Sequence, residues 1–133
     1  QRDEGVRALL NLGHTFAHAL EAATGYSDRL MHGEGVAIGM VLAHEFSARL
    51  GLAPAADAER VVAHLKDVGL PTRIGDIPGD KLAAATLLDH IGQDKKVERG
   101  RLTFILTRGI GKAFIAKDIP PADVAAFLEE KVG

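Results

Sequence analysis

Apolar residues recur at helical spacing through the first half of the chain. They line one face of residues 3–25, where Gly13 interrupts the pattern, so this segment is either one helix or two short helices with a bend at residues 11–13. Residues 33–50 are apolar around much of the helical circumference, which predicts a central, well-buried helix. Residues 55–68 form a third helical pattern, and the glycine and proline that follow predict its end.

Strand signals occur in the second half of the chain. Residues 72–80 predict a loop, and residues 81–91 a short helix. Two β-prone runs, residues 102–106 and 113–116, flank a glycine-containing turn, which is typical of a hairpin. A proline pair predicts the start of a final helix over residues 120–131. The fold class that follows is mainly α, with one small β-hairpin near the C-terminus.

Length and composition favour a single globular domain with its own core. The chain has 133 residues, of which 47% are hydrophobic and 26% charged, and its formal net charge is −2. Mixed charges without a basic stripe, and only 5% aromatic residues, argue against nucleic-acid binding. No apolar run approaches the roughly 20 residues that span a bilayer, so we expect no association with a membrane. Gln1 stands where an initiator Met would, so we expect the natural polypeptide to begin earlier.

The candidate chemistry lies among the histidines, because the chain has no Cys to supply a thiolate. Zero Cys also fits a cytoplasmic location. His14 and His18 are four residues apart, so a continuous helix places them on one face. His32 stands at the start of the next predicted helix, and antiparallel packing would bring it toward that face. Imidazoles from neighbouring helices can bind zinc. Two nearby carboxylates, Glu21 and Glu34, could act as further ligands or orient an imidazole ring. For Glu21, a solvated or ring-orienting role is favoured over that of a ligand.

These residues alone leave two interpretations open. Pairs of His with this spacing are common on helices, so the pair of His14 and His18 by itself favours an ordinary structural role. The sequence His32-Gly33-Glu34 at a predicted helix start adds a third nitrogen donor and a carboxylate. With that addition, a metal site and a structural role are equally well supported.

The other polar residues and glycines have ordinary interpretations on composition alone. The run Asp94-Lys95-Lys96 is typical of a solvated face, and Arg7 is typical of a helix surface. Three further histidines are expected at surface or boundary positions: His44, His64 and His90. Three glycines predict close helix packing and no phosphate-binding turn, because no strand precedes them: Gly33, Gly35 and Gly39.

Three blocks of residues stand in a fixed order along the chain. They are RALLNLGHTFAHALE at residues 7–21, HGEGVAIGM at residues 32–40, and DKK at residues 94–96, followed by a hydrophobic strand and GIG at residues 109–111. In this order they resemble the signature blocks of the 3-dehydroquinate synthase family, whose first block usually reads R-x-x-L-N-x-G-H-T-x-G-H-A-x-E. The departures are substitutions at positions without a chemical role: Ala17 for Gly, Gly35 for Ala, and Ile91-Gly92 where Met is frequent.

The resemblance implies a fold, a reaction and partners. Residues 1–133 would form the helical, metal- and substrate-binding C-terminal domain of a two-domain enzyme whose NAD-binding N-terminal domain is absent from this chain. That enzyme would convert a phosphorylated sugar acid, 3-deoxy-D-arabino-heptulosonate 7-phosphate, into 3-dehydroquinate and phosphate in the shikimate pathway. It would use Zn²⁺ or Co²⁺ together with NAD, and it would be a homodimer at full length.

The resemblance also assigns roles to individual residues. His14 and His32 correspond to two metal ligands, and the third ligand, a Glu, belongs to the absent N-terminal half. His18 corresponds to a catalytic residue that handles the substrate and its protons. Four residues correspond to substrate contacts: Arg7, Asn11, Lys95 and Lys96. Of the two lysines, Lys96 is favoured over Lys95 as the catalytic contact with a substrate anion. No residue of this chain is assigned to NAD.

Several alternatives remain open from the sequence. Related sugar-phosphate cyclases, such as 2-deoxy-scyllo-inosose synthase or epi-valiolone synthases, share these blocks, and polyol dehydrogenases have a similar helical half. A non-catalytic helical metal-binding module is a further possibility. The presence of Arg7, Asn11 and both Lys95 and Lys96 favours the dehydroquinate synthase family. Because the NAD-binding half and one metal ligand are missing, we expect the 133 residues alone to have no synthase activity.

Overall fold

A computed structural model describes residues 12–25, 30–79, 81–94, 102–108 and 112–132 of the chain. Its elements, in chain order, are α2 (His14–Ala23), α3 (His32–Arg49), α4 (Ala55–Asp67), the 3₁₀ turn η1 (Ile74–Asp76), α5 (Ala84–Asp94), β1 (Leu102–Thr107), β2 (Ala113–Ile119) and α6 (Pro121–Val132). The mainly α fold with one antiparallel hairpin is therefore confirmed.

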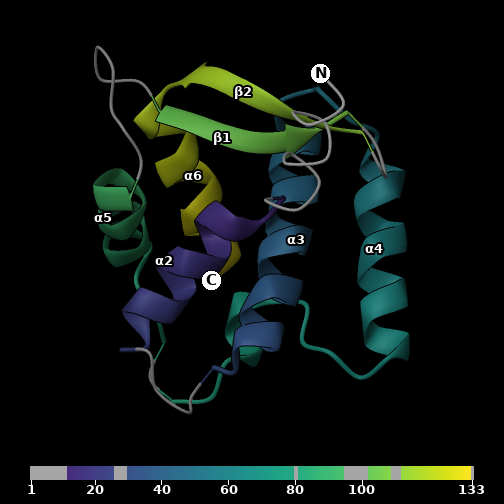
Figure 1. Ribbon diagram of the computed structural model, residues 1–133, viewed down its shortest axis with the longest axis vertical. Helices are drawn as coiled ribbons and strands as arrows, with labels where there is room; N and C mark the ends of the chain where they lie inside the picture. Colours follow the sequence, from purple (N-terminus) through teal and green to yellow (C-terminus); the bar gives the residue numbers. More distant parts are fainter. Residues whose placement is uncertain (1–11, 26–29, 80, 95–101, 109–111, 133) are drawn as a thin grey trace.

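Helix α3 stands at the centre of the arrangement (Figure 1). In that view α2 crosses it on one side and α4 runs beside it on the other, while the β1–β2 hairpin lies across the top of the helices. Ten of its residues are buried, which confirms the prediction drawn from its apolar circumference. The centre of the molecule is therefore a helix with neighbours on most of its sides.

Four phenylalanine rings from four different elements form the middle of the core. Phe16 of α2 and Phe104 of β1 lie with their ring centroids 5.4 Å apart, and Phe46 of α3 stacks on Phe127 of α6 at 4.8 Å. All four side chains are at most 2% exposed. Buried aromatic side chains contribute large apolar areas, so this cluster joins the hairpin and the last helix to α2 and α3.

A buried hydroxyl also links the hairpin to α3. Oγ of Ser47 donates to the carbonyl of Ala43 one turn earlier at 2.7 Å, and it accepts the backbone N–H of Thr107 at 3.0 Å. Both Ser47 and Thr107 are fully buried. Because a buried polar group must find a partner, these bonds fix where the end of β1 meets α3.

Helices α2 and α3 approach each other through two glycines. Gly13 has φ +84°, and a Cβ placed on it would lie 2.6 Å from the backbone nitrogen of Met40. A Cβ placed on Gly39 would lie 2.4 Å from the carbonyl oxygen of Gly13. No side chain fits between these two backbones, so glycine at both positions sets the distance between the helices.

Most of the predicted element boundaries are confirmed to within a few residues. Helix α2 begins directly after Gly13, as the interrupted pattern allowed, and α3, α4 and α6 follow their predicted ranges. The predicted loop over residues 72–80 contains η1, and α5 starts three residues later than predicted and continues to Asp94. Strand β2 continues past the predicted residue 116 to Ile119, with Thr107 paired to Ala113 beside the turn. None of the described helices is both long and apolar enough to cross a membrane.

One prediction about burial was wrong. His44, expected at the surface or boundary, is only 3% exposed. Its Nδ1 donates to the carbonyl of Met40 at 2.8 Å, and its Nε2 is buried with no hydrogen-bond partner within the described part of the chain. Solvent-type residues on the same helix suggested an exposed face, but the elements packed around α3 cover most of the helix.

Candidate metal-binding site

Helix α2 presents two imidazoles and a carboxylate on one face. His14, His18 and Glu21 follow each other at intervals of four and three residues, which the 3.6-residue turn brings into line. The two imidazole rings are stacked, with their centroids 5.0 Å apart and an angle of 27° between their planes. His14 is half-buried and His18 is exposed. The predicted common face of the His pair is confirmed.

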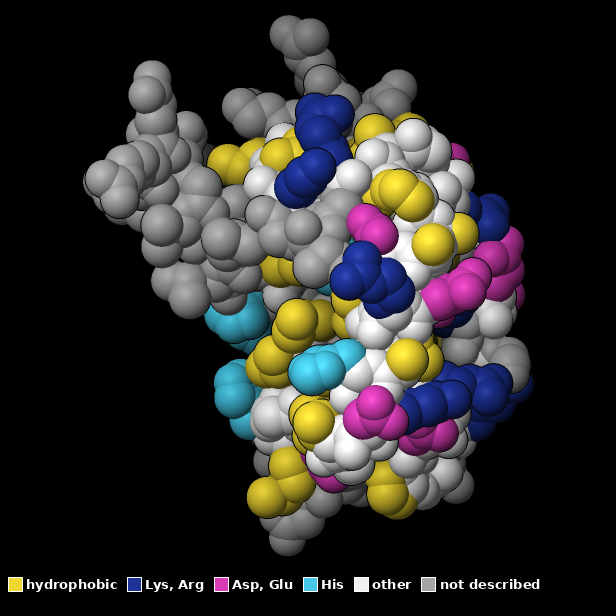
Figure 2. Space-filling model, turned by 90° about the vertical axis from the view of Figure 1, so that its right-hand side faces the viewer, with side chains coloured by type: hydrophobic (Ala, Val, Ile, Leu, Met, Phe, Trp, Pro, Cys, Tyr) yellow, Lys and Arg dark blue, Asp and Glu magenta, His cyan; other side chains and the backbone are white. Residues whose placement is uncertain are grey.

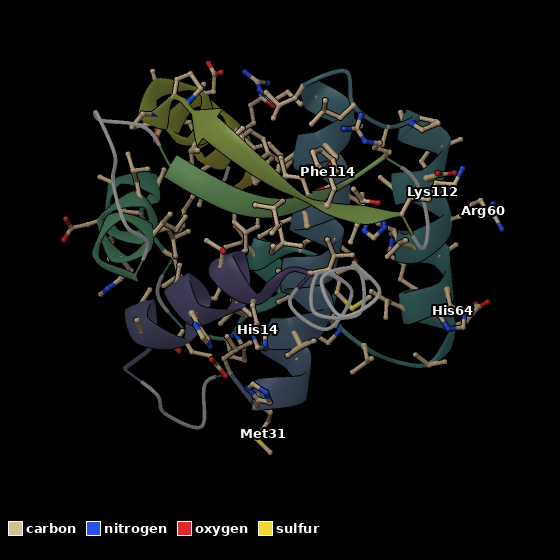
Figure 3. The ribbon with its side chains drawn as sticks, turned by 45° about the horizontal axis from the view of Figure 1, so that its top comes forward. His14, Met31, Arg60, His64, Lys112 and Phe114 are labelled. Carbon is tan, nitrogen blue, oxygen red and sulfur yellow. The ribbon has the colours of Figure 1, made fainter. Side chains whose placement is uncertain are left out.

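Helix α3 brings its first residue to the same face of α2. Nδ1 of His32 lies 2.7 Å from Oε2 of Glu21, so the two helices are joined by a side-chain contact across eleven residues of sequence. The side chain of Glu21 is 14% exposed, whereas that of His32 is 70% exposed. In Figure 3, His14 lies against the ribbons of α2 and α3, and Met31, the residue directly before His32, marks the start of α3 on the same side.

Glu34, the second acidic candidate, has a different role from Glu21. Oε1 of Glu34 accepts the backbone N–H of Met31 at 3.0 Å, which satisfies a free donor at the start of α3. A carboxylate in the first turn also favours the positive end of the helix dipole. Glu34 therefore caps the helix that carries His32, while Glu21 contacts the imidazole ring.

The donor types here suit a borderline divalent metal ion. Imidazole nitrogens bind Zn²⁺ and Co²⁺ well, and a carboxylate behind the imidazole is a frequent companion of such ligands. Within the described residues there is no group of three or more His, Cys, Asp or Glu that could hold one ion. His14 and His32 therefore offer the right type of donor atom for such an ion, but the described residues alone do not supply three ligands.

The structure does not describe the other predicted site residues. Arg7, Asn11, Lys95 and Lys96 lie outside the described residues, so their predicted contacts with a substrate stay predictions. Helix α5 ends at Asp94, the first residue of that third block.

The three remaining histidines are not part of the α2–α3 face as far as the structure describes it. His64 is exposed on α4, and Figure 3 shows it on the far side of α3 from His14. His90 lies half-buried on α5. In Figure 2, His side chains lie at the left edge and near the middle of the face shown, and most Asp and Glu side chains lie from the middle to the right.

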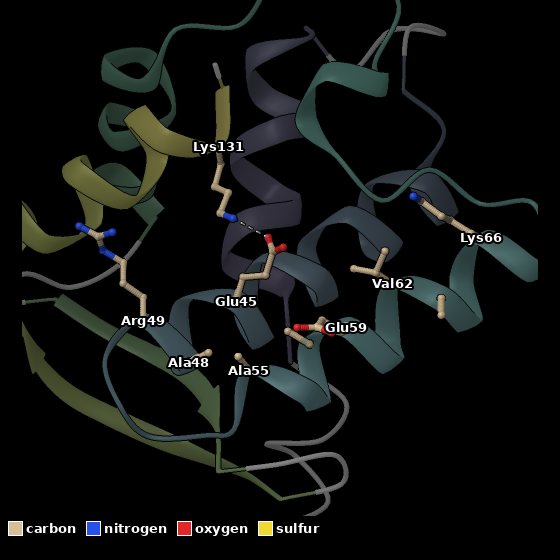
Figure 4. A pocket seen from close by; sticks show the side chains of 10 residues that line it. Glu45, Ala48, Arg49, Ala55, Glu59, Val62, Lys66 and Lys131 are labelled. Carbon is tan, nitrogen blue, oxygen red and sulfur yellow. Dashed lines mark ion pairs between the residues drawn. The ribbon is translucent and has the colours of Figure 1, made fainter.

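A groove of about 690 Å³ lies between α3 and α4 (Figure 4). Its floor is made of small apolar side chains such as Ala48, Ala55 and Val62. Nζ of Lys131 reaches Oε1 of Glu45 at 3.3 Å beside it. The groove is lined by no histidine, and its cations stand among acidic side chains, so its volume alone gives it no chemical role.

Sequence reasoning could not decide which carboxylate meets which imidazole. The interval of seven residues between His14 and Glu21 was a usable signal, because it places both on one face of α2. The pairing of Glu21 with His32, however, depends on how α3 crosses α2. That crossing is set by Gly13 and Gly39: the close helix packing predicted for Gly39 is confirmed, but no local pattern identifies Gly13 as its partner.

Comparison with solved structures identifies the class of fold. The described fold is similar to 2-deoxy-scyllo-inosose synthase complexed with carbaglucose-6-phosphate, NAD⁺ and Co²⁺, with a TM-score of 0.75 and 24% identity over 91% of this chain and 33% of that one. It is also similar to 2-epi-5-epi-valiolone synthase from Streptomyces hygroscopicus subsp. jinggangensis with NAD⁺ and Zn²⁺ bound, with a TM-score of 0.71 and 26% identity over 92% of this chain and 32% of that one. The chain has the fold of about one third of these synthases.

Sequence comparison then gives the family. The family model described as 3-dehydroquinate synthase C-terminal matches residues 1–97. Similar proteins include the 3-dehydroquinate synthases of Rhizobium rhizogenes, 69% identical over 98% of this chain, and of Brucella anthropi, 66% identical over 99%. This chain belongs to the 3-dehydroquinate synthase C-terminal family. It spans 35% of the length of the relatives it matches.

Proposed function

We propose that this chain is the metal- and substrate-binding C-terminal domain, residues 1–133, of a 3-dehydroquinate synthase. The whole enzyme would convert 3-deoxy-D-arabino-heptulosonate 7-phosphate into 3-dehydroquinate and phosphate. The observation that carries the proposal is the placement of the His14 helix face against His32, within a chain 69% identical to a 3-dehydroquinate synthase. An N-terminal domain would bind most of NAD, and the full-length protein would be a homodimer.

His14 and His32 would bind the metal ion, Zn²⁺ or Co²⁺, with a third ligand from the N-terminal domain. When bound, the ion would stabilise negative charge on a substrate oxygen, and NAD would supply the oxidising group. The part played by this chain is to hold two imidazoles on neighbouring helices at a fixed separation. The backbone contact between Gly13 and Gly39 and the contact of Glu21 with His32 support that role.

His18 would handle a proton of the substrate. An imidazole can both donate and accept protons near neutral pH, and the stacked ring of His14 places His18 beside a proposed metal ligand. The substrate carries a carboxylate and a phosphate, which suit the guanidinium of Arg7 and the ammonium groups of Lys95 and Lys96. Asn11 would add a neutral hydrogen-bonding group, and Lys96 would be the catalytic contact among these.

The degree of identity favours this substrate over those of the related cyclases. Eight 3-dehydroquinate synthases are 64–69% identical to this chain, whereas three solved cyclase structures that share its fold are 23–26% identical. A 2-deoxy-scyllo-inosose synthase remains the alternative that an experiment should test directly, because it shares both the fold and the sequence blocks.

The test is a phosphate-release assay on the full-length polypeptide with Zn²⁺ and NAD. We expect release from 3-deoxy-D-arabino-heptulosonate 7-phosphate and only background release from glucose 6-phosphate. The 133-residue chain alone, assayed in the same way, should give background release with either compound. Preferential turnover of glucose 6-phosphate would favour the alternative, and phosphate release by the 133 residues alone would contradict the proposed division of the site between two domains.

A further inference from the structure

Glu21 contacts one proposed metal ligand, His32, and shares a helix face with the other, His14. We infer that Glu21 is a positioning residue that fixes the tautomer and orientation of His32, so that the Nε2 of His32 is presented to the metal ion. This inference rests on the proposed metal site for its function. Its structural basis, however, is a contact that the described residues show directly.

The contact has the geometry of a charge-assisted hydrogen bond. Nδ1 of His32 and Oε2 of Glu21 are 2.7 Å apart. An ionised carboxylate can only accept hydrogen bonds, so the proton between the two groups belongs to Nδ1. A neutral imidazole carries one proton, and Nε2 therefore keeps the lone pair that a metal ion requires.

The carboxylate is the better-held partner of the pair. The side chain of Glu21 is 14% exposed and that of His32 is 70% exposed. Glu21 lies against the first turn of α3, where a Cβ on Gly35 would be 3.6 Å from its Cγ and 3.3 Å from Leu30. A side chain packed in this way loses little further freedom on bonding, so Glu21 restricts His32 more than the reverse.

Glu21 also joins the two helices that carry the proposed ligands. It shares one face of α2 with His14, two turns further along, and it bonds the first side chain of α3. The neighbouring carboxylate of Glu34 is occupied by the backbone N–H of Met31. Among these two acidic residues, only Glu21 is placed to orient an imidazole.

The first arm of the test measures the tautomer in the 133-residue chain without metal. Long-range nitrogen–proton NMR correlations, at a pH where the imidazole is neutral, should show His32 with its proton on Nδ1. In Glu21→Ala, the His32 signals should shift toward the Nε2–H form. The matched control is Glu34→Ala, which removes the same charge near the same helix end and should leave the His32 tautomer unchanged. An Nε2–H tautomer in the unaltered chain, or a shift of equal size in both variants, would overturn the inference.

The second arm measures Co²⁺ and Zn²⁺ affinity in the full-length polypeptide. Loss of a carboxylate that orients a ligand typically weakens metal binding about 10–100-fold. We expect a loss of affinity in this range for Glu21→Ala and no such loss for Glu34→Ala. Glu21→Gln keeps the size and an acceptor oxygen, and it should recover part of the affinity. Equal affinity in Glu21→Ala and the unaltered protein would overturn the positioning role. Metal that fails to perturb His14 and His32 in the unaltered protein would instead overturn the proposed metal site, whatever the tautomer.

Discussion

The two long sides of α3 pack against their neighbours in different ways. On the α2 side, backbone meets backbone at Gly13 and Gly39, and the residues that follow on α2 carry imidazoles and a carboxylate. On the α4 side, the contact is made by a small cluster of Ala37, Val41 and Leu65, with an open groove beside it. On the α2 side the two helix backbones are in contact and leave no room for a side chain between them, whereas on the α4 side a groove is open beside the contact. A metal site needs fixed distances, so the close side is where it can be built.

Charged residues show the same difference. Glu21 on the α2 side is largely buried and bonds one imidazole at 2.7 Å. The ion pairs beside the groove instead join α3 to α6 through exposed or half-exposed side chains, Arg49 with Glu130 and Lys131 with Glu45. Solvent-screened pairs of this kind contribute little to stability. A change on the α2 side should therefore affect the proposed metal site, whether or not it also lowers stability, and one on the α4 side should affect stability alone or nothing.

The largest expected effect is on catalysis. His14→Ala or His32→Ala removes a proposed metal ligand, which should reduce phosphate release by the full-length polypeptide more than about 100-fold, beyond the effect of losing an orienting group. His64→Ala is the matched control, because His64 is exposed on α4. A His64 variant as inactive as the other two would show that the assay responds to general damage.

The next effect is steric and specific to the α2 side. Gly39→Ala places a methyl group 2.4 Å from a backbone oxygen, and overpacking of this kind lowers the free energy of unfolding by about 3 kcal/mol. Gly33→Ala is on the same helix, and no described atom outside its own turn lies within 4 Å of the added carbon, so it should leave stability unchanged or raise it by up to about 1 kcal/mol. Urea unfolding of both variants compares their free energies of unfolding. Equal values would mean that the close approach of α2 and α3 at Gly39 does not constrain the residue there.

A cavity on the α4 side should lower stability without changing the site. Leu65→Ala removes a side chain that is 9% exposed, in a cluster with few buried members, so we expect a loss of about 2 kcal/mol, at the low end for such substitutions. Metal affinity of the full-length polypeptide should be unchanged. A parallel loss of metal affinity would show that the two sides of α3 are coupled.

The smallest expected effect is at the groove. Lys131→Ala breaks the contact with Glu45, whose groups are 3.3 Å apart and partly exposed. Such pairs contribute at most about 1 kcal/mol, and less at high salt. Urea unfolding at low and high salt measures the loss of stability and its salt dependence. A loss well above about 1 kcal/mol would show that the pair has a structural role.

The helices and the hairpin were predictable because their signals are local. Apolar spacing, together with Gly and Pro, predicted α3, α4, α6 and the paired strands to within a few residues. The interruption at Gly13 was also visible, although its positive φ and its contact with Gly39 were not. The common face of His14 and His18 followed from their spacing alone.

The remaining features depend on contacts between distant segments. The burial of His44 results from the elements that pack around α3, which the solvent-type residues of that helix did not indicate. The four-phenylalanine cluster and the bond of Thr107 to Ser47 join residues up to 111 positions apart. The choice of Glu21 over Glu34 as the partner of His32 likewise required the crossing of α2 and α3.

Diffraction from crystals of the zinc-loaded full-length polypeptide, collected at the zinc absorption edge, tests the shared metal ion most directly. One anomalous peak should lie about 2 Å from Nε2 of His32 and about 2 Å from a ring nitrogen of His14. Glu21 should remain bonded to Nδ1 of His32. A zinc peak bound by only one of these two imidazoles, or by neither, would contradict the account.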